Sequence, residues 1–158
     1  MSVPERELVL REFTRNEMPP DSTGLPGAER VNRYESAPRT FGVGPGAEFI
    51  DFFNAELIPG IEMSGGFARF QPGGRLPAHL HDFDESICIT DGSASCLVEG
   101  RRYSLSDCAT AMVPRGRVHY FVNDSSKPMD MIWVYAGPMP ERIVVDEACG
   151  TESRNAWS

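Results

Sequence analysis

Two stretches carry the strongest pattern in this sequence: GGRLPAHLHDFDESICITDG at residues 73–92 and PRGRVHYFVN at residues 114–123. Together they hold all three histidines of the chain, His79, His81 and His119. In both stretches, short apolar runs alternate with turn-forming glycine and proline, which is typical of short β-strands.

The histidines have a spacing that suits a shared ligand site. Alternate residues of a strand point to one face of the sheet, so His79 and His81 share a face. Glu85 keeps the same parity and reaches that face if the segment stays extended. His119 lies in another predicted strand and can add a third imidazole from across a barrel. Three nitrogens and one carboxylate oxygen suit a mid-row transition metal.

The rest of the chain has the same short-strand character, because its 15 glycines and 13 prolines are spread along it. A helical period is visible only weakly, near Glu5–Phe13. Gly65-Gly66 predicts a bulge or a bend inside its strand. The expected strands are Phe49–Phe53, Ile61–Phe70, His79–Thr90, Ser93–Val98, Arg101–Leu105, Ala109–Val113, Val118–Val122, Met129–Tyr135 and Ile143–Val145.

Composition narrows the class of protein. The chain has 158 residues and a net charge of -8, so we expect neither nucleic acid nor an anionic membrane surface as a partner. The charged N-terminus is unlike a signal peptide, and no apolar run has the length of a membrane helix; both predict a cytoplasmic protein. The cysteines, Cys88, Cys96, Cys108 and Cys149, form no C-x-x-C pair.

The first stretch resembles the first motif of the cupins, G-x5-H-x-H-x3,4-E-x6-G. Gly73, His79, His81, Glu85 and Gly92 occupy its positions with every spacing matched.

The second stretch is similar to the second cupin motif, G-x5-P-x-G-x2-H-x3-N. Pro114, Gly116, His119 and Asn123 stand in register with it. Cys108 replaces the leading glycine, so we expect the turn before Ala109 to differ, although it lies far along the chain from His119.

This resemblance implies an all-β fold, a double-stranded β-barrel of the jelly-roll type. We expect an N-terminal arm at residues 1–46, the barrel at 47–146 and a C-terminal tail at 147–158. By resemblance, one divalent transition metal per chain is bound by His79, His81, Glu85 and His119. Iron(II) is favoured, with manganese, nickel, zinc and copper as alternatives.

Several other residues receive structural expectations. The alternation that places Glu85 and His119 on the inward face also includes Ile87, Ile89 and Phe121, which should line the barrel wall. Asn123 should hold the end of a strand in place. Met131, Trp133 and Tyr135 share a face that belongs either to the pocket or to a dimer interface.

The catalytic side chain is left unassigned, with Arg69 and Tyr135 as candidates. Arg69 either faces inward with an anionic partner or is solvated, and Arg75 either guards the mouth or is solvated. Asp82 and Asp84 offer spare carboxylates or form a solvated loop edge. No residue is assigned to an organic cofactor.

Three functions fit these observations. The first is a non-haem Fe(II) dioxygenase acting on a small oxygen-chelating substrate such as a diketone, a phenol or an organic acid. The second is a non-redox metal-dependent isomerase, lyase or decarboxylase, for which Tyr135, Asp82 or Asp84 would have to act as base. The third is a cupin that binds a metal or ligand without turnover.

The resemblance also predicts a homodimer, because small cupins often pair by exchanging a terminal strand. Analytical ultracentrifugation of the purified chain should give the mass of two copies. A sedimentation coefficient that fits a single 17.5 kDa chain at working concentration would contradict this prediction.

Overall fold

A computed structural model describes residues 32–35, 37, 39–41, 44–139 and 141–146. The weak helical pattern near Glu5–Phe13, the predicted tail at 147–158 and Cys149 lie outside these residues. The described residues contain no helix of the length and hydropathy that a membrane span requires. They form the strands β1 (Arg39–Phe41), β2 (Ala47–Phe53), β3 (Ser64–Phe70), β4 (His79–Leu80), β5 (Glu85–Asp91), β6 (Ser93–Val98), β7 (Arg101–Ser106), β8 (Thr110–Val113), β9 (His119–Val122), β10 (Met129–Tyr135) and β11 (Ile143–Val144).

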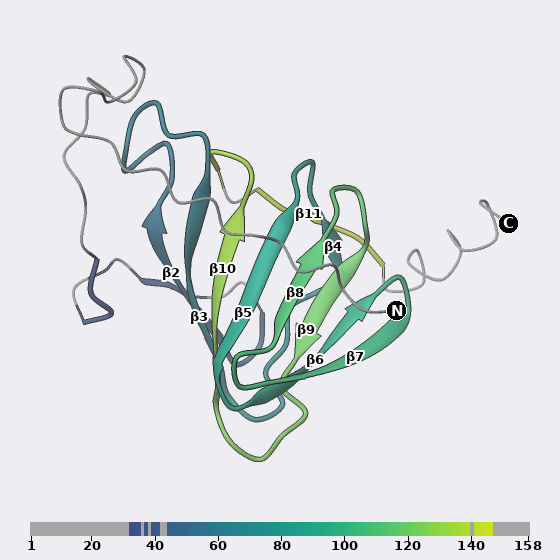
Figure 1. Ribbon diagram of the computed structural model, residues 1–158. Helices are drawn as coiled ribbons and strands as arrows, with labels where there is room; N and C mark the ends of the chain where they lie inside the picture. The colour runs from purple at the N-terminus through teal and green to yellow at the C-terminus, as the bar shows by residue number, and fades with distance from the viewer. Residues whose placement is uncertain (1–31, 36, 38, 42–43, 140, 147–158) are drawn as a thin grey trace, which may run out of the picture. The chain divides into compact units, whose positions relative to one another are not determined.

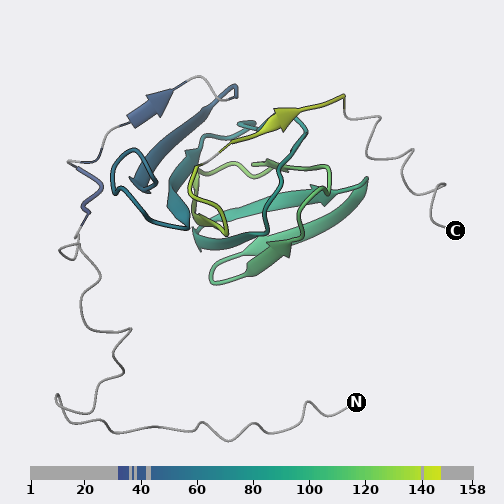
Figure 2. The same ribbon diagram turned by 90° about the horizontal axis from the view of Figure 1, so that it is seen from above.

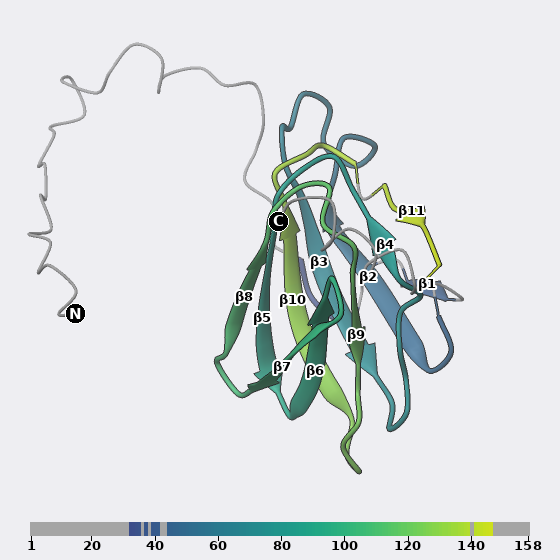
Figure 3. The same cartoon turned by 90° about the vertical axis from the view of Figure 1, so that its right-hand side faces the viewer.

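The strands form two antiparallel sheets that face each other (Figures 1 and 3). One sheet has the order β1-β2-β3-β10-β5-β8 and the other β11-β4-β9-β6-β7. Within the described residues, no hydrogen-bonded ladder joins the two sheets into a closed cylinder. The predicted all-β jelly-roll is therefore confirmed, as a double-layered shell rather than a fully closed barrel.

From β3 onward the chain passes repeatedly from one sheet to the other, so both walls of the interior are built from segments close in sequence (Figure 2). Alternate residues of each strand point inward and pack together. The predicted wall residues Ile87, Ile89 and Phe121 are fully buried. The shared face of β10 also lies in the interior. The buried core consists of Ala47, Phe49, Ala68, Phe70, Leu76, Ile87, Ile89, Ala94, Cys96, Leu105, Val113, Phe121, Met129, Met131, Trp133 and Tyr135.

The structure corrects the single strand predicted over His79–Thr90. Strand β4 ends at Leu80 and β5 begins at Glu85 in the opposite sheet. The backbone N–H of Gly116 donates to the carbonyl of His81, and that of Ala136 to the carbonyl of Asp84, at 2.8 and 2.9 Å. These bonds hold the chain as it crosses between the sheets.

The predicted irregularity at Gly65-Gly66 is present, and the extra residue lies on the partner strand. The pairing of β2 with β3 shifts register between Asp51 and Phe53, opposite these glycines. A Cβ on Gly66 would lie 1.9 Å from the carbonyl oxygen of Ile50 and 2.8 Å from the ring of Trp133. The close approach of the Ile50 backbone, and of the Trp133 ring, therefore requires glycine here. The strand itself is shorter than predicted and begins at Ser64.

Asn123 has the role predicted for it. Its Nδ2 donates to the carbonyls of Phe70 and Lys127, and its Oδ1 accepts from the backbone and the hydroxyl of Ser125. The amide thereby fixes the end of β9 to the end of β3 and to the turn before β10.

The turn before Ala109 keeps a left-handed backbone although it lacks glycine. Cys108 has φ +61°, and its N–H donates to the carbonyl of Ile89 at 2.9 Å. The expectation that this turn differs is therefore wrong for its backbone, which has the left-handed conformation that glycine favours. A residue with a Cβ costs about 1–2 kcal/mol in this region, so the fold retains a strained residue here.

Replacing Cys108 by glycine should relieve this strain. The gain is offset in part by the greater freedom of glycine in the unfolded chain. We expect Cys108→Gly to be roughly 0.5–1 kcal/mol more stable than Cys108→Ala, which also removes the thiol but keeps the Cβ. Urea unfolding of both variants measures the difference, and equal midpoints would show that the turn is unstrained.

Candidate metal centre

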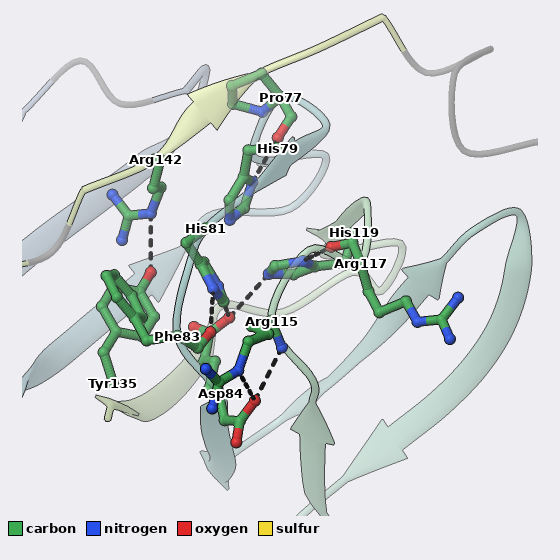
Figure 4. Close-up of polar contacts among 11 residues, drawn as sticks. Pro77, His79, His81, Phe83, Asp84, Arg115, Arg117, His119, Tyr135 and Arg142 are labelled. Atoms are coloured by element: carbon green, nitrogen blue, oxygen red, sulfur yellow. Dashed lines mark hydrogen bonds and ion pairs between the residues drawn. The ribbon is translucent and has the colours of Figure 1, made fainter. Parts of the chain in front are cut away.

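The four candidate ligands lie close together in the interior. Figure 4 labels three of them, His79, His81 and His119. His79 and His119 are direct cross-strand partners on β4 and β9, while His81 follows β4 and Glu85 opens β5. One potential ligand atom from each lies within 4.8 Å of the others, and all four residues are buried. The sequence prediction placed His119 across the barrel, but Glu85 is the residue that comes from the opposite sheet.

Each imidazole is held by a backbone carbonyl two residues away. Because a carbonyl can only accept, Nδ1 of each ring must carry the proton and donate it. In the neutral form of each ring, Nε2 then carries the lone pair that binds a cation. The Nδ1–carbonyl pairs are His79–Pro77 at 2.9 Å, His81–Phe83 at 2.6 Å and His119–Arg117 at 2.8 Å.

The distances between ligand atoms fit a shared divalent cation. Oε2 of Glu85 lies 3.1 Å from Nε2 of His81 and 2.8 Å from Nε2 of His119. Adjacent ligands of a six-coordinate ion with bonds of about 2.1 Å are separated by about 3.0 Å. Without a proton or metal ion between them, these lone pairs would repel the carboxylate. The buried site is therefore compatible with one divalent metal, whose identity it does not determine.

Burial sets the protonation of the ligands. Desolvation, with the nearby His119 as a smaller cause, lowers the pKa of His79 to about 3, so the ring is neutral at neutral pH. Burial by itself raises the pKa of Glu85, but contacts with His119 and His81 outweigh it and hold the pKa at about 2. His79 thus presents a neutral imidazole and Glu85 an ionised carboxylate, the forms that bind metals.

Asp84 contributes to the backbone rather than to the ligand set. Its Oδ1 accepts from the backbone N–H of Arg115 at 2.9 Å. This bond ties the crossing between β4 and β5 to the turn before β9. Asp82 is solvent-exposed. The prediction of a loop edge fits both residues.

Apolar and aromatic side chains surround the cluster. Phe83 stacks on His81 with an interplanar angle of 8°. Tyr135 lies 4.9 Å from the His81 ring, between centroids. Below them, Ile87 and Phe121 are fully buried. Aromatic and aliphatic side chains therefore border the cluster on these sides.

Of the two catalytic candidates, the structure brings only Tyr135 to the ligands. Arg69 points away from the interior side chains Ala68 and Phe70 and makes two bonds to Asp130, at 2.6 and 2.7 Å. Its anionic partner is therefore a protein side chain, Asp130, on the outward face of the sheet.

Arg75 also lies away from the ligands. Its guanidinium covers the ring of Tyr120, 5.0 Å from the centroid. Tyr120 alternates with the inward-facing His119 and Phe121 on β9, so it faces outward.

Sequence reasoning missed Arg142. Its Nε donates to the Tyr135 hydroxyl at 2.9 Å (Figure 4). Its guanidinium lies beside the rings of Phe49, Trp133 and Tyr135. No motif marks this residue. The only sequence signal was its place directly before the predicted strand Ile143–Val145, which the structure pairs with β4 as β11.

Fold and ligand cluster together define a two-sheet jelly-roll β-protein with a His3Glu site. Residues 66–135 match the family model described as the cupin domain. Over these residues the sequence matches a cupin domain, and the solved structures described next share its fold.

Solved structures share the fold at low sequence identity. The chain is 18% identical to the polyketide cyclase RemF from Streptomyces resistomycificus, with a TM-score of 0.63, covering 75% of this chain and 86% of that one. A cupin-2 domain protein from Rhodospirillum rubrum gives 12% identity and a TM-score of 0.65. The match covers 81% of this chain and 88% of that one. An oxalate oxidase in complex with the substrate analogue glycolate gives 20% identity and a TM-score of 0.63. The match covers 88% of this chain and 75% of that one.

One curated relative shares part of the sequence. The chain is 34% identical over 67 residues to an endoribonuclease YbeY from Myxococcus xanthus, which covers 42% of this chain. The match spans only 22% of that protein, so the activity in its name is not transferred to this chain.

The ligand assignment predicts the effect of removing a histidine. His79→Ala or His119→Ala should lose most of the bound metal, an affinity loss of at least about 100-fold. Glu85→Ala should retain metal more weakly than the unaltered protein, because three imidazoles remain. Metal content per chain, measured by plasma mass spectrometry after dialysis, provides the comparison.

Arg102→Ala is the control, since Arg102 pairs with Asp124 on the surface, away from the cluster. It should keep full metal content. Unchanged metal content in both histidine variants would refute the assignment.

Proposed function

We propose that this cupin is a metal-dependent enzyme, specifically a non-haem Fe(II) dioxygenase acting on a small oxygen-chelating substrate. The observation that carries the proposal is the convergence of three imidazoles, each tied to a backbone carbonyl through Nδ1, on the carboxylate of Glu85. Four protein ligands leave further coordination positions for a substrate and for dioxygen.

The protein residues have distinct roles in this proposal. His79, His81, His119 and Glu85 would hold the iron, which when bound supplies redox chemistry and open positions for oxygen ligands. Ile87 and Phe121 keep the space below the ligands apolar and limit side reactions with water. The carbonyl-bound imidazoles need no rearrangement to receive a metal.

Tyr135 is suited to donate a hydrogen bond rather than to remove a proton. Burial, followed by the charge of Glu85, raises its pKa, while Arg142 acts in the opposite direction but less strongly. The phenol therefore stays protonated at neutral pH and can orient a substrate oxygen.

The non-redox alternative needs a base, and the described residues offer none beside the ligands. The other buried carboxylates, Glu99 and Asp130, are paired with Arg117 and Arg69. Asp84 is engaged with Arg115 and Asp82 is exposed. Because no base is available there, this arrangement favours a chelating substrate that is acidic enough to lose its proton without one.

The names of the structural relatives support enzymatic chemistry on small oxygen-rich molecules without selecting one reaction. One is named a polyketide cyclase and another an oxalate oxidase. A metal-dependent isomerase or lyase therefore stays the second candidate, and the identity of the metal separates the two.

Elemental analysis of protein purified without added metal and without chelator tests the proposal. We expect close to one iron per chain, together with oxygen uptake on addition of acetylacetone or catechol. His119→Ala should abolish the uptake and Arg102→Ala should preserve it.

Other outcomes would redirect or end the proposal. Manganese, nickel or zinc in place of iron, with no oxygen uptake, would favour the non-redox enzyme. Failure to retain any ion after reloading would leave a cupin that binds ligands without metal chemistry.

A further inference from the structure

The shell is open on the side where β7 and β8 lie. β7 is the last strand of one sheet and β8 is the last strand of the other, and no ladder pairs them within the described residues. A cavity of about 400 Å³ is lined by residues of β6 and β7 on one side and of β8 on the other. This volume is in the range of pockets that bind small molecules.

The cavity adjoins the metal ligands in both sheets. Its lining residue Val113 is the direct cross-strand partner of Glu85. Its lining residue Val98 is the direct partner of His119. Directly paired residues share a face of the sheet, so both valines face inward with the ligands. Neighbouring strands are about 4.8 Å apart. A group attached directly to a metal-chelating unit therefore has the length to reach the cavity.

The inner part of the cavity wall is apolar and uncharged. Cys96, Leu105 and Val113 are buried, and Ala111 packs against the core. Burial, followed by the charge of Glu85, raises the pKa of Cys96 to about 12, so its thiol is neutral at neutral pH. A wall of this kind favours an apolar group over a charged one, because a charged group would lose its hydration without gaining a partner.

The charged residues of the lining already have an anionic partner. Nη1 of Arg117 donates to both carboxylate oxygens of Glu99, at 2.9 and 3.1 Å. Arg101 lies 3.8 Å from the same carboxylate. Both arginines are solvent-exposed and mark the mouth of the cavity. Neither of them requires a negative charge from a ligand.

Tyr103 supplies an aromatic ring at the solvent side of the cavity. It is the direct partner of the buried Cys96, so it faces the same side of the sheet, yet 47% of it is exposed. An exposed aromatic ring that borders an apolar cavity gains contact area when a second ring enters. Two such rings pack favourably in an offset or edge-to-face arrangement.

We propose that the cavity between β7 and β8 binds an aromatic group of the substrate, so that the substrate is a chelator with an aryl substituent rather than a wholly aliphatic one. This inference rests on the proposed function and narrows its substrate class. The chelating oxygens would lie beside Glu85 and His119, and the aromatic ring would lie between Val98, Val113 and Tyr103.

The test compares two diketones that differ by one ring, acetylacetone and benzoylacetone. In benzoylacetone a phenyl group replaces one methyl group, and both chelating oxygens are retained. Binding to the iron-loaded protein is measured by calorimetry without oxygen, so no turnover is needed. We expect benzoylacetone to bind at least about tenfold more tightly, because burying the ring removes apolar surface from water.

Ala111→Phe tests whether this preference arises in the cavity. Ala111 lines the cavity and is the direct partner of the buried Ile87, so a phenyl side chain at this position would occupy the space. The ratio of the two affinities should fall to near one. A ratio that stays near ten would place the ring elsewhere and refute the proposal.

Ser104→Phe is the matched control. It adds the same side chain to β7 but on the outer face, because Ser104 alternates with the inward-facing Tyr103 and Leu105. It should leave the affinity ratio unchanged.

Tyr103→Ala provides a second variant that spares the core, since Tyr103 is exposed. It should weaken benzoylacetone binding several-fold. Iron content and thermal stability of every variant are measured alongside binding. If benzoylacetone affinity falls only in variants that also lose iron, the effect belongs to folding and the assignment of the cavity is overturned.

The remaining outcomes distinguish the two proposals. Equal affinity for both diketones in the unaltered protein, with acetylacetone bound, would refute the aromatic pocket alone. If the iron-loaded protein binds neither diketone, both the pocket and the proposed function are contradicted. If Ala111→Phe instead lowers the sedimenting mass without changing the affinity ratio, a second copy of the chain covers the cavity and the pocket is refuted.

Discussion

The site depends on the hydrogen bonds that join Nδ1 of the three histidines to backbone carbonyls. They place a proton on Nδ1 of all three rings. Nε2 of His81 and of His119 then faces the Glu85 carboxylate. Each carbonyl lies two residues from its histidine, so the position of every ring follows from the local path of the chain. That path is set by the crossing between β4 and β5 and by the turn that leads into β9.

Much of this arrangement could be predicted because the motif spacings are local. The four ligands, the inward face of β5 and the role of Asn123 all followed from short-range pattern and the resemblance. The break between β4 and β5 did not, because alternation of apolar residues cannot distinguish an extended segment from two strands in opposite sheets. Counting alternate residues along one strand predicted that Glu85 lies with the histidines. Glu85 does lie with them, although it comes from a second strand in the opposite sheet.

Arg142 shows the other limit of sequence reasoning. It belongs to no motif, and its importance arises only when β11 returns to pair with β4 and brings the guanidinium to Tyr135. No sequence motif marks the Ser64 hydroxyl either, which is buried without a hydrogen-bond partner among the described residues. Its environment depends on the register across three strands. The four candidate ligands could be predicted from spacing, whereas the surroundings of Arg142 and Ser64 depend on tertiary contacts.

The central claim is that the buried His3Glu cluster binds one divalent metal. Anomalous diffraction from crystals of the metal-loaded protein, recorded at the absorption edge of the bound element, tests it most directly. The account predicts a single peak between Nε2 of His79, His81 and His119 and the Glu85 carboxylate, at about 2.1 Å from each ligand atom. A peak elsewhere on the chain, with none between these four side chains, would contradict it.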